Sequence, residues 1–161
     1  MPDRFNRSPV AIYSATTPAA LITAAHLAIS PGSQAASSLG ELCAKVMPCA
    51  ATAFDAASVR SAVENVAANA LDALQERGGG GVLALRAVQR NGTVELLVED
   101  NGPGIPEGVR ASLFAPFASG NSGTGLGLAI ARALARAGGG DLTCERSVPG
   151  HTAFRFTFRP A

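Results

Sequence analysis

Positive charge is sparse in this sequence, and lysine is nearly absent. Lys45 is the single lysine, the arginines stand apart from one another along 161 residues, and the formal net charge is +1. A protein that binds a phosphodiester backbone needs cationic side chains clustered on one surface. The composition therefore excludes an electrostatic nucleic-acid-binding surface, and we expect no nucleic-acid partner.

Cysteine is also scarce, and no long uninterrupted hydrophobic run is present. Cys43, Cys49 and Cys144 are odd in number and lack the close pairing of zinc or redox sites, so we expect free, buried thiols. The apolar stretch at residues 10–30 is interrupted by proline, histidine and several serines and threonines, which argues against a membrane span or a signal peptide. We expect a soluble, cytoplasmic chain without membrane contact. Any membrane anchor would belong to a part of a longer protein outside this sequence.

The length of the chain suits one domain better than two, because 161 residues can bury one well-packed core. Of its residues 47% are hydrophobic, with a large share of alanine, so we expect a modestly packed core. Residues 1–50 are rich in Ala, Ser, Thr and Pro and predict a poorly defined segment with short helices at 19–29 and 38–46. The folded domain is expected over residues 51–161.

After residue 55 the hydrophobic pattern becomes regular. A long helix over 56–75 has Asp55 as its N-cap and ends at a glycine run, and Asn91-Gly92 suits a tight turn between two strands. The other expected elements are strands at 82–88 and 93–98, a short helix at 107–114 inside a loop from 101 to 125, a helix from 126 to 137, and strands at 141–145 and 152–158. This order predicts an α+β fold, a two-layer α/β sandwich with helices on one face of a mixed, mostly antiparallel sheet.

One face of the long helix carries oxygen-bearing side chains. At about 100° per residue, four of them fall within an arc of about 60°: Asn65, Asn69, Asp72 and Glu76. Mg²⁺ accepts one or two such protein ligands beside waters and the phosphates of a nucleotide. A solvated helix face is the alternative explanation for this stripe.

A second polar group lies where the second strand ends, in residues 99–106, Glu-Asp-Asn-Gly-Pro-Gly-Ile-Pro. The carboxylate of Asp100, at the end of the strand, can accept a hydrogen bond from an exocyclic amino group. Gly102 and Gly104 let a planar base approach the backbone. An ordinary Asn-Gly-Pro-Gly turn would explain the same residues.

Glycines recur at alternate positions in residues 123–128, Gly-Thr-Gly-Leu-Gly-Leu, immediately before a predicted helix. Free amides at the start of a helix bind phosphate. The segment is not a dinucleotide fingerprint, because Leu128 stands where a third glycine is needed, and it lacks the Gly-Lys-Ser/Thr ending of a P-loop. The hinge of a mobile lid is the structural alternative.

Together these segments resemble the four sequence boxes of the GHKL superfamily, whose ATP-binding domain has the Bergerat fold, and specifically the catalytic domain of bacterial sensor histidine kinases. Residues 65–70, Asn-Val-Ala-Ala-Asn-Ala, are similar to the N box, and residues 100–104, Asp-Asn-Gly-Pro-Gly, to the G1 box. Residues 113–117, Leu-Phe-Ala-Pro-Phe, are similar to the F box, and 123–128 to the G2 box. The boxes occur in the family's order, and the resemblance covers about residues 55–160.

The resemblance implies roles for individual residues. Asn69, supported by Asn65, would coordinate Mg²⁺ and serve the catalytic step, and Asp100 would recognise the amino group of adenine. Phe114 and Phe117 would pack the lid or contact the helix that carries the phosphoacceptor. The other residues implied to bind ATP are Asp72, Gly102, Gly104, Ile105, Gly123, Thr124, Gly125, Leu126, Gly127 and Thr152.

The implied function is that of a histidine kinase. The domain would bind Mg-ATP and transfer the γ-phosphoryl group to a histidine on a dimerisation domain, and a response regulator would act downstream. The sequence shows no phosphoacceptor box, because His26 lacks the residues that follow such a histidine, so the acceptor would lie in a partner or in a missing part of the protein. The alternative is a non-catalytic, stand-alone nucleotide-binding regulator that sequesters a partner, as the related anti-sigma factors do.

Overall fold

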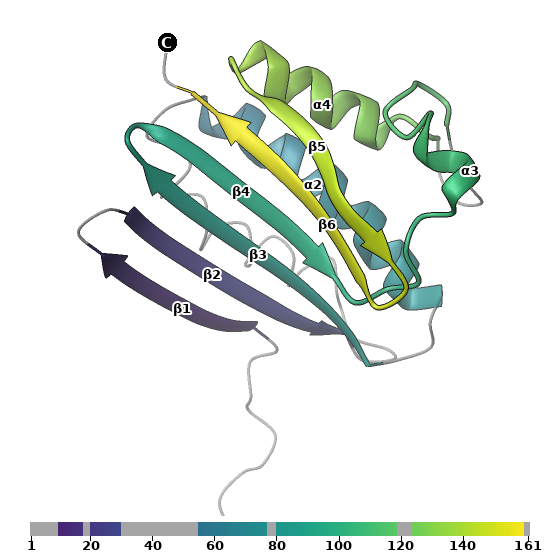
Figure 1. Cartoon of the computed structure of the whole chain (residues 1–161), viewed down its shortest axis with the longest axis horizontal. Helices are drawn as coiled ribbons and strands as arrows, with labels where there is room; N and C mark the ends of the chain where they lie inside the picture. The colour runs from purple at the N-terminus through teal and green to yellow at the C-terminus, as the bar shows by residue number, and fades with distance from the viewer. Residues whose placement is uncertain (1–9, 18–19, 30–54, 77–79, 119–123, 160–161) are drawn as a thin grey trace, which may run out of the picture.

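The computed structural model describes residues 10–17, 20–29, 55–76, 80–118 and 124–159. In this part six strands form one sheet in the order β1-β2-β3-β4-β6-β5, and the helices α2 and α4 lie on one of its faces (Figure 1). The elements are β1 (Val10–Thr17), β2 (Ala20–Ile29), α2 (Ala56–Glu76), β3 (Gly81–Arg90), β4 (Thr93–Asp100), α3 (Glu107–Arg110), α4 (Gly127–Ala137), β5 (Asp141–Val148) and β6 (His151–Phe158). The predicted two-layer α+β sandwich is confirmed.

Helix α2 begins where Asp55 caps it. The Asp55 carboxylate accepts hydrogen bonds from the hydroxyl of Ser58, at 2.6 Å, and from its backbone N–H, at 3.0 Å, and these bonds lower the pKa of Asp55. Such a cap satisfies an N–H group that has no partner inside the helix. The helix ends at Glu76, two residues before the start of the glycine run that predicts its end.

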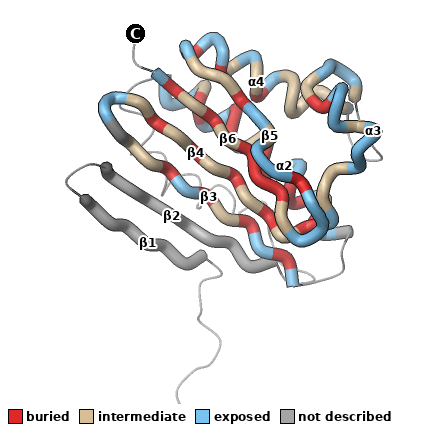
Figure 2. Tube along the Cα trace, viewed as in Figure 1, coloured by how far each residue is buried: buried red, intermediate tan, exposed pale blue. Residues whose placement is uncertain are grey.

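The β3–β4 hairpin sets the orientation of the end of β4. Asn91 and Gly92 both have positive φ angles, of 51° and 77°, as the expected two-residue turn requires. Buried and part-exposed residues alternate along the whole of β4 (Figure 2). Val94, Val98 and Asp100 are therefore on the same face of the sheet. That face carries the core, and Asp100 therefore points toward the helix layer at the end of the strand.

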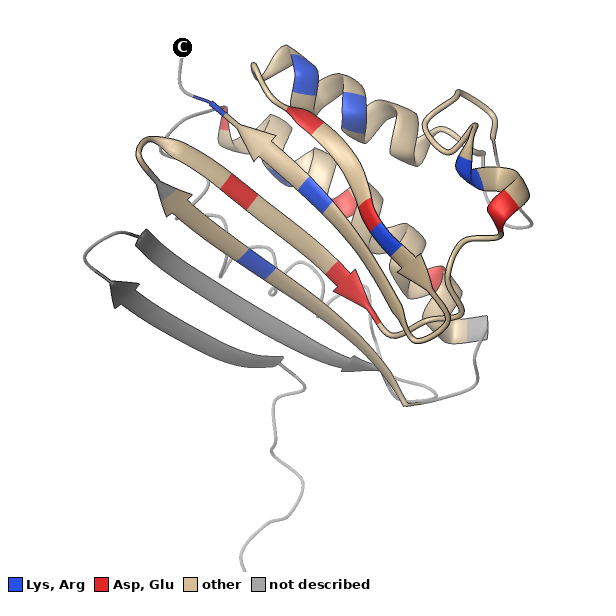
Figure 3. Cartoon of the chain, viewed as in Figure 1, with Lys and Arg blue, Asp and Glu red and all other residues tan. Residues whose placement is uncertain are grey.

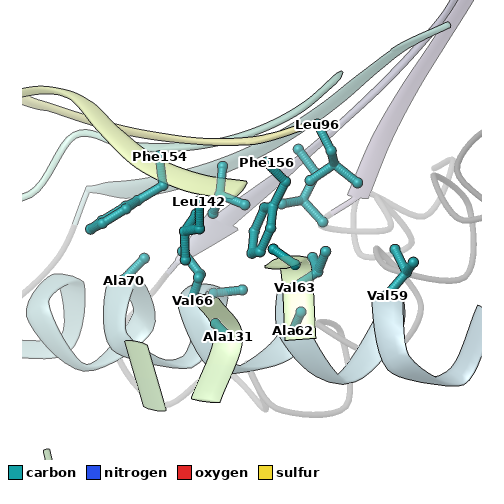
Figure 4. Close-up of a cluster of buried hydrophobic side chains, with 14 of the residues drawn as sticks. Val59, Ala62, Val63, Val66, Ala70, Leu96, Ala131, Leu142, Phe154 and Phe156 are labelled. Atoms are coloured by element: carbon teal, nitrogen blue, oxygen red, sulfur yellow. The ribbon is translucent and has the colours of Figure 1, made fainter. Parts of the chain in front are cut away.

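The hydrophobic core lies between the two long helices and the inner face of the sheet. Apolar side chains of α2 point toward those of the strands (Figure 4). Alanines such as Ala62 on α2 and Ala131 on α4 are fully buried, so small side chains let the helices approach each other and the sheet. No helix within the described ranges is long and apolar enough to cross a membrane.

The segment at residues 19–29 was expected to be helical, and this prediction is wrong: β2 is a strand. It pairs antiparallel with β3 from Leu21 opposite Gln89 to Ile29 opposite Gly81, and with β1 on its other side. Alanine favours a helix locally, but pairing on both sides gives the backbone groups of β2 partners and overrides that preference. The other helix predicted near the N-terminus, at 38–46, lies outside the described residues, and the division of the chain at residue 50 stays a prediction.

The short helix predicted at 107–114 is also shorter than expected. Only α3 is α-helical, and the chain continues in turns, with the Ser112 N–H bonded to the Val109 carbonyl and the Leu113 N–H to the Arg110 carbonyl. This three-residue spacing does not propagate an α-helix. The remaining elements after residue 55 are confirmed with small shifts of their ends. Each pairing between described strands is antiparallel, so the parallel part of the expected mixed sheet is not found among them.

Candidate functional site

Three polar residues of the described core form one row across the end of the sheet. Asp100, Thr152 and Ser147 are only 8%, 4% and 6% exposed. Asp100 of β4 lies opposite Thr152 of β6, which lies opposite Ser147 of β5. Buried polar side chains are costly unless they have partners, so a row of them at one sheet end marks a candidate site.

The Asp100 carboxylate is the charged member of this row. Burial raises its pKa, while a hydrogen bond from the Gly102 N–H to Oδ1, at 2.8 Å, and the charge of His151 act in the opposite direction. No hydrogen bond joins Oδ2 to another residue of the described ranges. A buried carboxylate with one oxygen available can accept a hydrogen bond from a ligand.

The loop after Asp100 packs against the β5–β6 hairpin. The Gly102 carbonyl accepts a hydrogen bond from the Gly150 N–H at 2.8 Å. Gly104 has a φ of +83°, and a Cβ there would lie 3.0 Å from the carbonyl carbon of Val148, so this position suits glycine. The Ile105 N–H donates to the Ser147 hydroxyl at 2.7 Å. These contacts fix the backbone of the loop beside the polar row.

The middle of α2 contacts the start of α4. A Cβ built at Gly127 would lie 3.7 Å from the Asn65 carbonyl oxygen, 3.7 Å from Asn69 Nδ2 and 3.8 Å from Asn65 Oδ1. Neither asparagine side chain has a hydrogen-bond partner among the described residues. The two predicted metal-binding amides therefore lie beside the first backbone amides of a helix, where the helix dipole favours a negative group.

The loop that follows Asp100 also reaches α2. A Cβ at Gly102 would lie 3.7 Å from Leu74 Cδ2, on the same helix as Asn65 and Asn69. The segments predicted as the N, G1 and G2 boxes thus all meet at α2. Gly123, in the predicted G2 box, lies outside the described residues; Thr124 and Asp72 are exposed, and Leu126 is part-buried at the N-cap of α4.

Phe117, in the predicted F box, is bonded to Gly125, in the predicted G2 box. The Phe117 N–H donates to the Gly125 carbonyl at 3.0 Å. Gly125 has a φ of +67°, and a Cβ there would lie 2.7 Å from the Phe117 carbonyl carbon, so glycine is required. Phe117 itself has a φ of 65° and a 75% exposed side chain. An exposed aromatic residue in a strained conformation is typical of a functional segment.

Phe114, by contrast, belongs to the packed part of the molecule. Its ring makes an edge contact with Phe154 at a centroid distance of 6.4 Å, and the guanidinium of Arg132 lies 4.6 Å from its centroid. Arg132 in turn donates two hydrogen bonds to Asp141. Phe114 therefore joins the turn after α3 to α4 and to the sheet, and its role in packing a lid stays a prediction.

Asn101 is a structural residue that the sequence reasoning did not single out. Its Oδ1 accepts a hydrogen bond from the Val82 N–H at 2.8 Å, and its Nδ2 donates to the Gly80 carbonyl at 3.1 Å. Its own N–H donates to the Val82 carbonyl. Asn101 thus ties the end of β4, and with it Asp100, to the start of β3. Asn101-Gly102 has the local pattern of a turn. The partners of Asn101 are 19 and 21 residues away in sequence, so no local pattern predicts them.

A cavity of about 290 Å³ lies next to this site, between the turn after α3 and β5. Its lining residues are Arg110, Leu113, Phe114, Cys144, Glu145, Arg146 and Ser147. Arg110 donates to the Ser147 carbonyl. Cys144 is a free, part-buried thiol whose pKa is raised by burial, and the other two cysteines lie outside the described residues. This cavity contains none of the asparagines or glycines predicted to bind ATP.

Comparison with known proteins identifies the family of the chain and several relatives. The family model described as histidine kinase-, DNA gyrase B-, and HSP90-like ATPase matches residues 54–161. The chain is 40% identical over 98 residues to the sensor-type histidine kinase PrrB of Mycobacterium tuberculosis, covering 58% of this chain and 21% of PrrB. It is 39% identical over 109 residues to the sensory histidine kinase/phosphatase NtrB of Klebsiella oxytoca, covering 62% and 31%. The chain thus spans a third or less of these curated relatives.

Solved structures show the same similarity. The mycobacterial sensor histidine kinase MprB matches with a TM-score of 0.54 and 31% identity over 67% of this chain and 77% of that one. Full-length ShkA in complex with AMPPNP matches with a TM-score of 0.57 and 32% identity over 66% and 23%. Because the family model covers more than half of the sequence, family membership does not depend on any single relative. The chain belongs to the family of histidine kinase-, DNA gyrase B- and HSP90-like ATPases.

Proposed function

We propose that this chain binds Mg-ATP and works as the catalytic domain of a sensor histidine kinase. The observation that carries the proposal is the meeting of three segments at α2: the asparagines of the helix itself, the loop after the buried Asp100, and the glycine-rich start of α4. The similarity to sensor histidine kinases supports the same activity.

The base of the nucleotide would bind at the polar row. Asp100 Oδ2 is available to accept a hydrogen bond from the amino group of adenine, and Thr152 lies directly opposite on β6. Gly102, Gly104 and Ile105 would border the base, because the glycines leave the backbone of the loop uncovered. This end of the site would provide recognition and orientation rather than chemistry.

The phosphates would lie at the other end, between α2 and the start of α4. The side-chain oxygens of Asn65 and Asn69 are the type of ligand that Mg²⁺ prefers, and both side chains lack other partners in the described ranges. When bound, Mg²⁺ supplies neutralisation of the phosphate charge. Gly125, Leu126 and Gly127 would present backbone amides to the phosphates, with Gly123 and Thr124 completing this segment and Asp72 at its edge.

Phosphoryl transfer depends on alignment and charge neutralisation, so such a site needs no covalent intermediate with the protein. The acceptor would be a histidine on a dimerisation domain, in a partner or elsewhere in a longer protein. The exposed Phe117 would contact the helix that carries it. A response regulator would act downstream, and the reaction would take place in the cytoplasm.

Isothermal titration with AMPPNP, with and without Mg²⁺, tests nucleotide binding. We expect Asn69→Ala to abolish the Mg²⁺-dependent part of the affinity, because an amide oxygen ligand is removed from an exposed position that carries no core packing. Gln75→Ala, which removes an exposed amide from the same helix, is the matched control and should bind as the unmodified chain does. Equal affinities for both variants would contradict the metal assignment.

Phosphoryl transfer is tested separately by mixing the chain with Mg-ATP and a histidine-bearing dimerisation domain. We expect an acid-labile phosphohistidine on that domain, and none with the Asn69→Ala variant. Absence of phosphohistidine with dimerisation domains of several sensor kinases would refute the kinase activity and leave nucleotide binding in place.

A further inference from the structure

Ser147 is a buried serine that contacts two separate parts of the segment between β4 and α4. Its hydroxyl accepts the hydrogen bond from the Ile105 N–H at 2.7 Å, and its carbonyl accepts a hydrogen bond from the Arg110 guanidinium. These partners are 42 and 37 residues away in sequence. Ser147 therefore anchors both the loop that follows Asp100 and the helix α3 to the edge strand β5.

An irregularity in β5 directs Ser147 toward the helix layer. Leu142 is buried on the inner face, and strict alternation would place residues 144, 146 and 148 on the same face. A register shift between Cys144 and Arg146 adds one residue, so Ser147 is buried while Arg146 is exposed. Bulges of this kind re-aim side chains and are frequent beside active sites.

The same irregularity brings Ser147 into line with the base-recognition residues. Ser147 lies opposite Thr152, and Thr152 lies opposite Asp100, so the three buried polar residues of the described core share one row. Ile105 borders the position proposed for the base, and its N–H is held by this serine alone among the described residues. The hydrogen bonds of Ser147 go to Ile105 and Arg110, and neither Asn65 nor Gly127 of the phosphate end is among these partners.

We propose that Ser147 is a positioning residue for the base of the nucleotide: by holding the Ile105 backbone it fixes the loop against which adenine lies. This inference rests on the proposed function. Ser147 acts through Ile105 and does not itself touch the phosphates. Its loss should therefore weaken the binding of a whole nucleotide and leave the binding of the phosphate chain unchanged.

The test compares AMPPNP with tripolyphosphate, both with Mg²⁺, by isothermal titration on four proteins: the unmodified chain, Ser147→Ala, Ser147→Thr and Thr143→Ala. We expect Ser147→Ala to bind AMPPNP about tenfold more weakly, because one hydrogen bond to a part-buried amide is lost. Tripolyphosphate should bind all four proteins equally. Ser147→Thr retains the hydroxyl and should restore AMPPNP binding, while Thr143→Ala removes an exposed hydroxyl of the same strand and should have no effect.

A second measurement needs no nucleotide. Hydrogen exchange of the Ile105 amide should be about tenfold faster in Ser147→Ala than in Thr143→Ala. Unchanged AMPPNP affinity or unchanged exchange in Ser147→Ala would overturn the inference while leaving the proposed function intact. An equal loss of AMPPNP and tripolyphosphate would show general damage and also overturn it. If the unmodified chain binds neither compound, the proposed function fails together with this inference.

Discussion

Among the buried residues of the described core, Asp100 is the one with a formal charge. Burial raises its pKa, which means that the folded protein binds the proton of this carboxyl more tightly than the unfolded chain does. Stability contributed by the protonated form is present below the ordinary pKa of 3.8 and is lost as the pH rises through the raised value. At neutral pH the ionised Asp100 is therefore a cost to folding, which a role in ligand recognition would explain.

This cost predicts opposite effects of Asp100→Asn on binding and on stability. The asparagine keeps an Oδ1 acceptor for the Gly102 N–H and removes the buried charge, so the melting temperature at pH 7 should be equal or higher. The affinity for AMPPNP should fall by about tenfold or more, since a carboxylate acceptor is lost. Calorimetric melting between pH 3 and pH 8 and isothermal titration measure both. A variant that melts lower and binds AMPPNP normally would contradict the assignment.

At this scale the sequence predicts the residues that carry local signals and misses those defined by distant contacts. Asp100, Gly102 and Gly104 follow a strand in a glycine-rich motif, so their neighbourhood was predictable. Ser147 sits in a strand with no unusual local pattern, and its importance comes from Ile105, which is 42 residues away. The bulge that turns it inward leaves no mark in the hydrophobic pattern.

At the scale of elements, the end of α4 is held to the start of β5 by charge. Arg132 donates to both carboxylate oxygens of Asp141, at 2.9 and 3.1 Å, and Arg136 donates to one of them at 3.1 Å. Figure 3 shows basic positions along α4 and an acidic position at the start of β5. The hydrogen bonds from Arg132 are the main cause that holds the pKa of Asp141 well below its usual range. Because Arg132 also stacks on Phe114, the same cluster contacts the turn that follows α3.

Asp141→Asn should weaken this contact between α4 and β5. A lowered pKa means that the stabilisation is present above the ordinary value of 3.8 and is lost as the pH falls through the lowered one. We expect the variant to lose about 1 kcal/mol of unfolding free energy at pH 7, because the groups are part-exposed and screened by solvent. Urea unfolding at pH 7 and at pH 2 measures this loss.

Arg60→Gln, which breaks an exposed ion pair within α2, is the control, and we expect it to lose less unfolding free energy. An equal loss of unfolding free energy in both variants would show that the α4–β5 cluster stabilises the fold no more than an ordinary exposed ion pair.

The elements that the sequence predicts correctly are those whose local signals agree with their packing. Helix α2 has a cap, a long apolar stripe and a glycine stop, and each points to the same structure. β2 was missed because its alanines favour a helix, whereas its structure depends on pairing with β3, about sixty residues further along the chain. Gly140 lies between α4 and β5. A Cβ there would lie 1.5 Å from the Thr157 carbonyl oxygen, so glycine at this position allows the chain to pass close to β6.

At the scale of the whole molecule, β1 and β2 extend the sheet beyond the part that matches the family. The match begins at residue 54, yet β2 pairs with β3 along nine residue pairs (Figure 1). The added strands therefore cover the edge of β3 that the matched region alone would leave open.

Removing residues 1–53 should separate the role of these strands from nucleotide binding. The fragment 54–161 keeps the whole region that matches the family and all the residues proposed to bind ATP, so it should fold and bind AMPPNP with unchanged affinity. It would also expose the edge of β3, and an exposed strand edge is a template for pairing with another chain. We therefore expect a lower melting temperature and concentration-dependent self-association, measured by calorimetry and analytical ultracentrifugation. Introducing a lysine into the exposed edge, at Ala84, should suppress the association, because edge charges oppose strand pairing. A fragment that loses AMPPNP binding would show that the first strands belong to the nucleotide-binding domain itself.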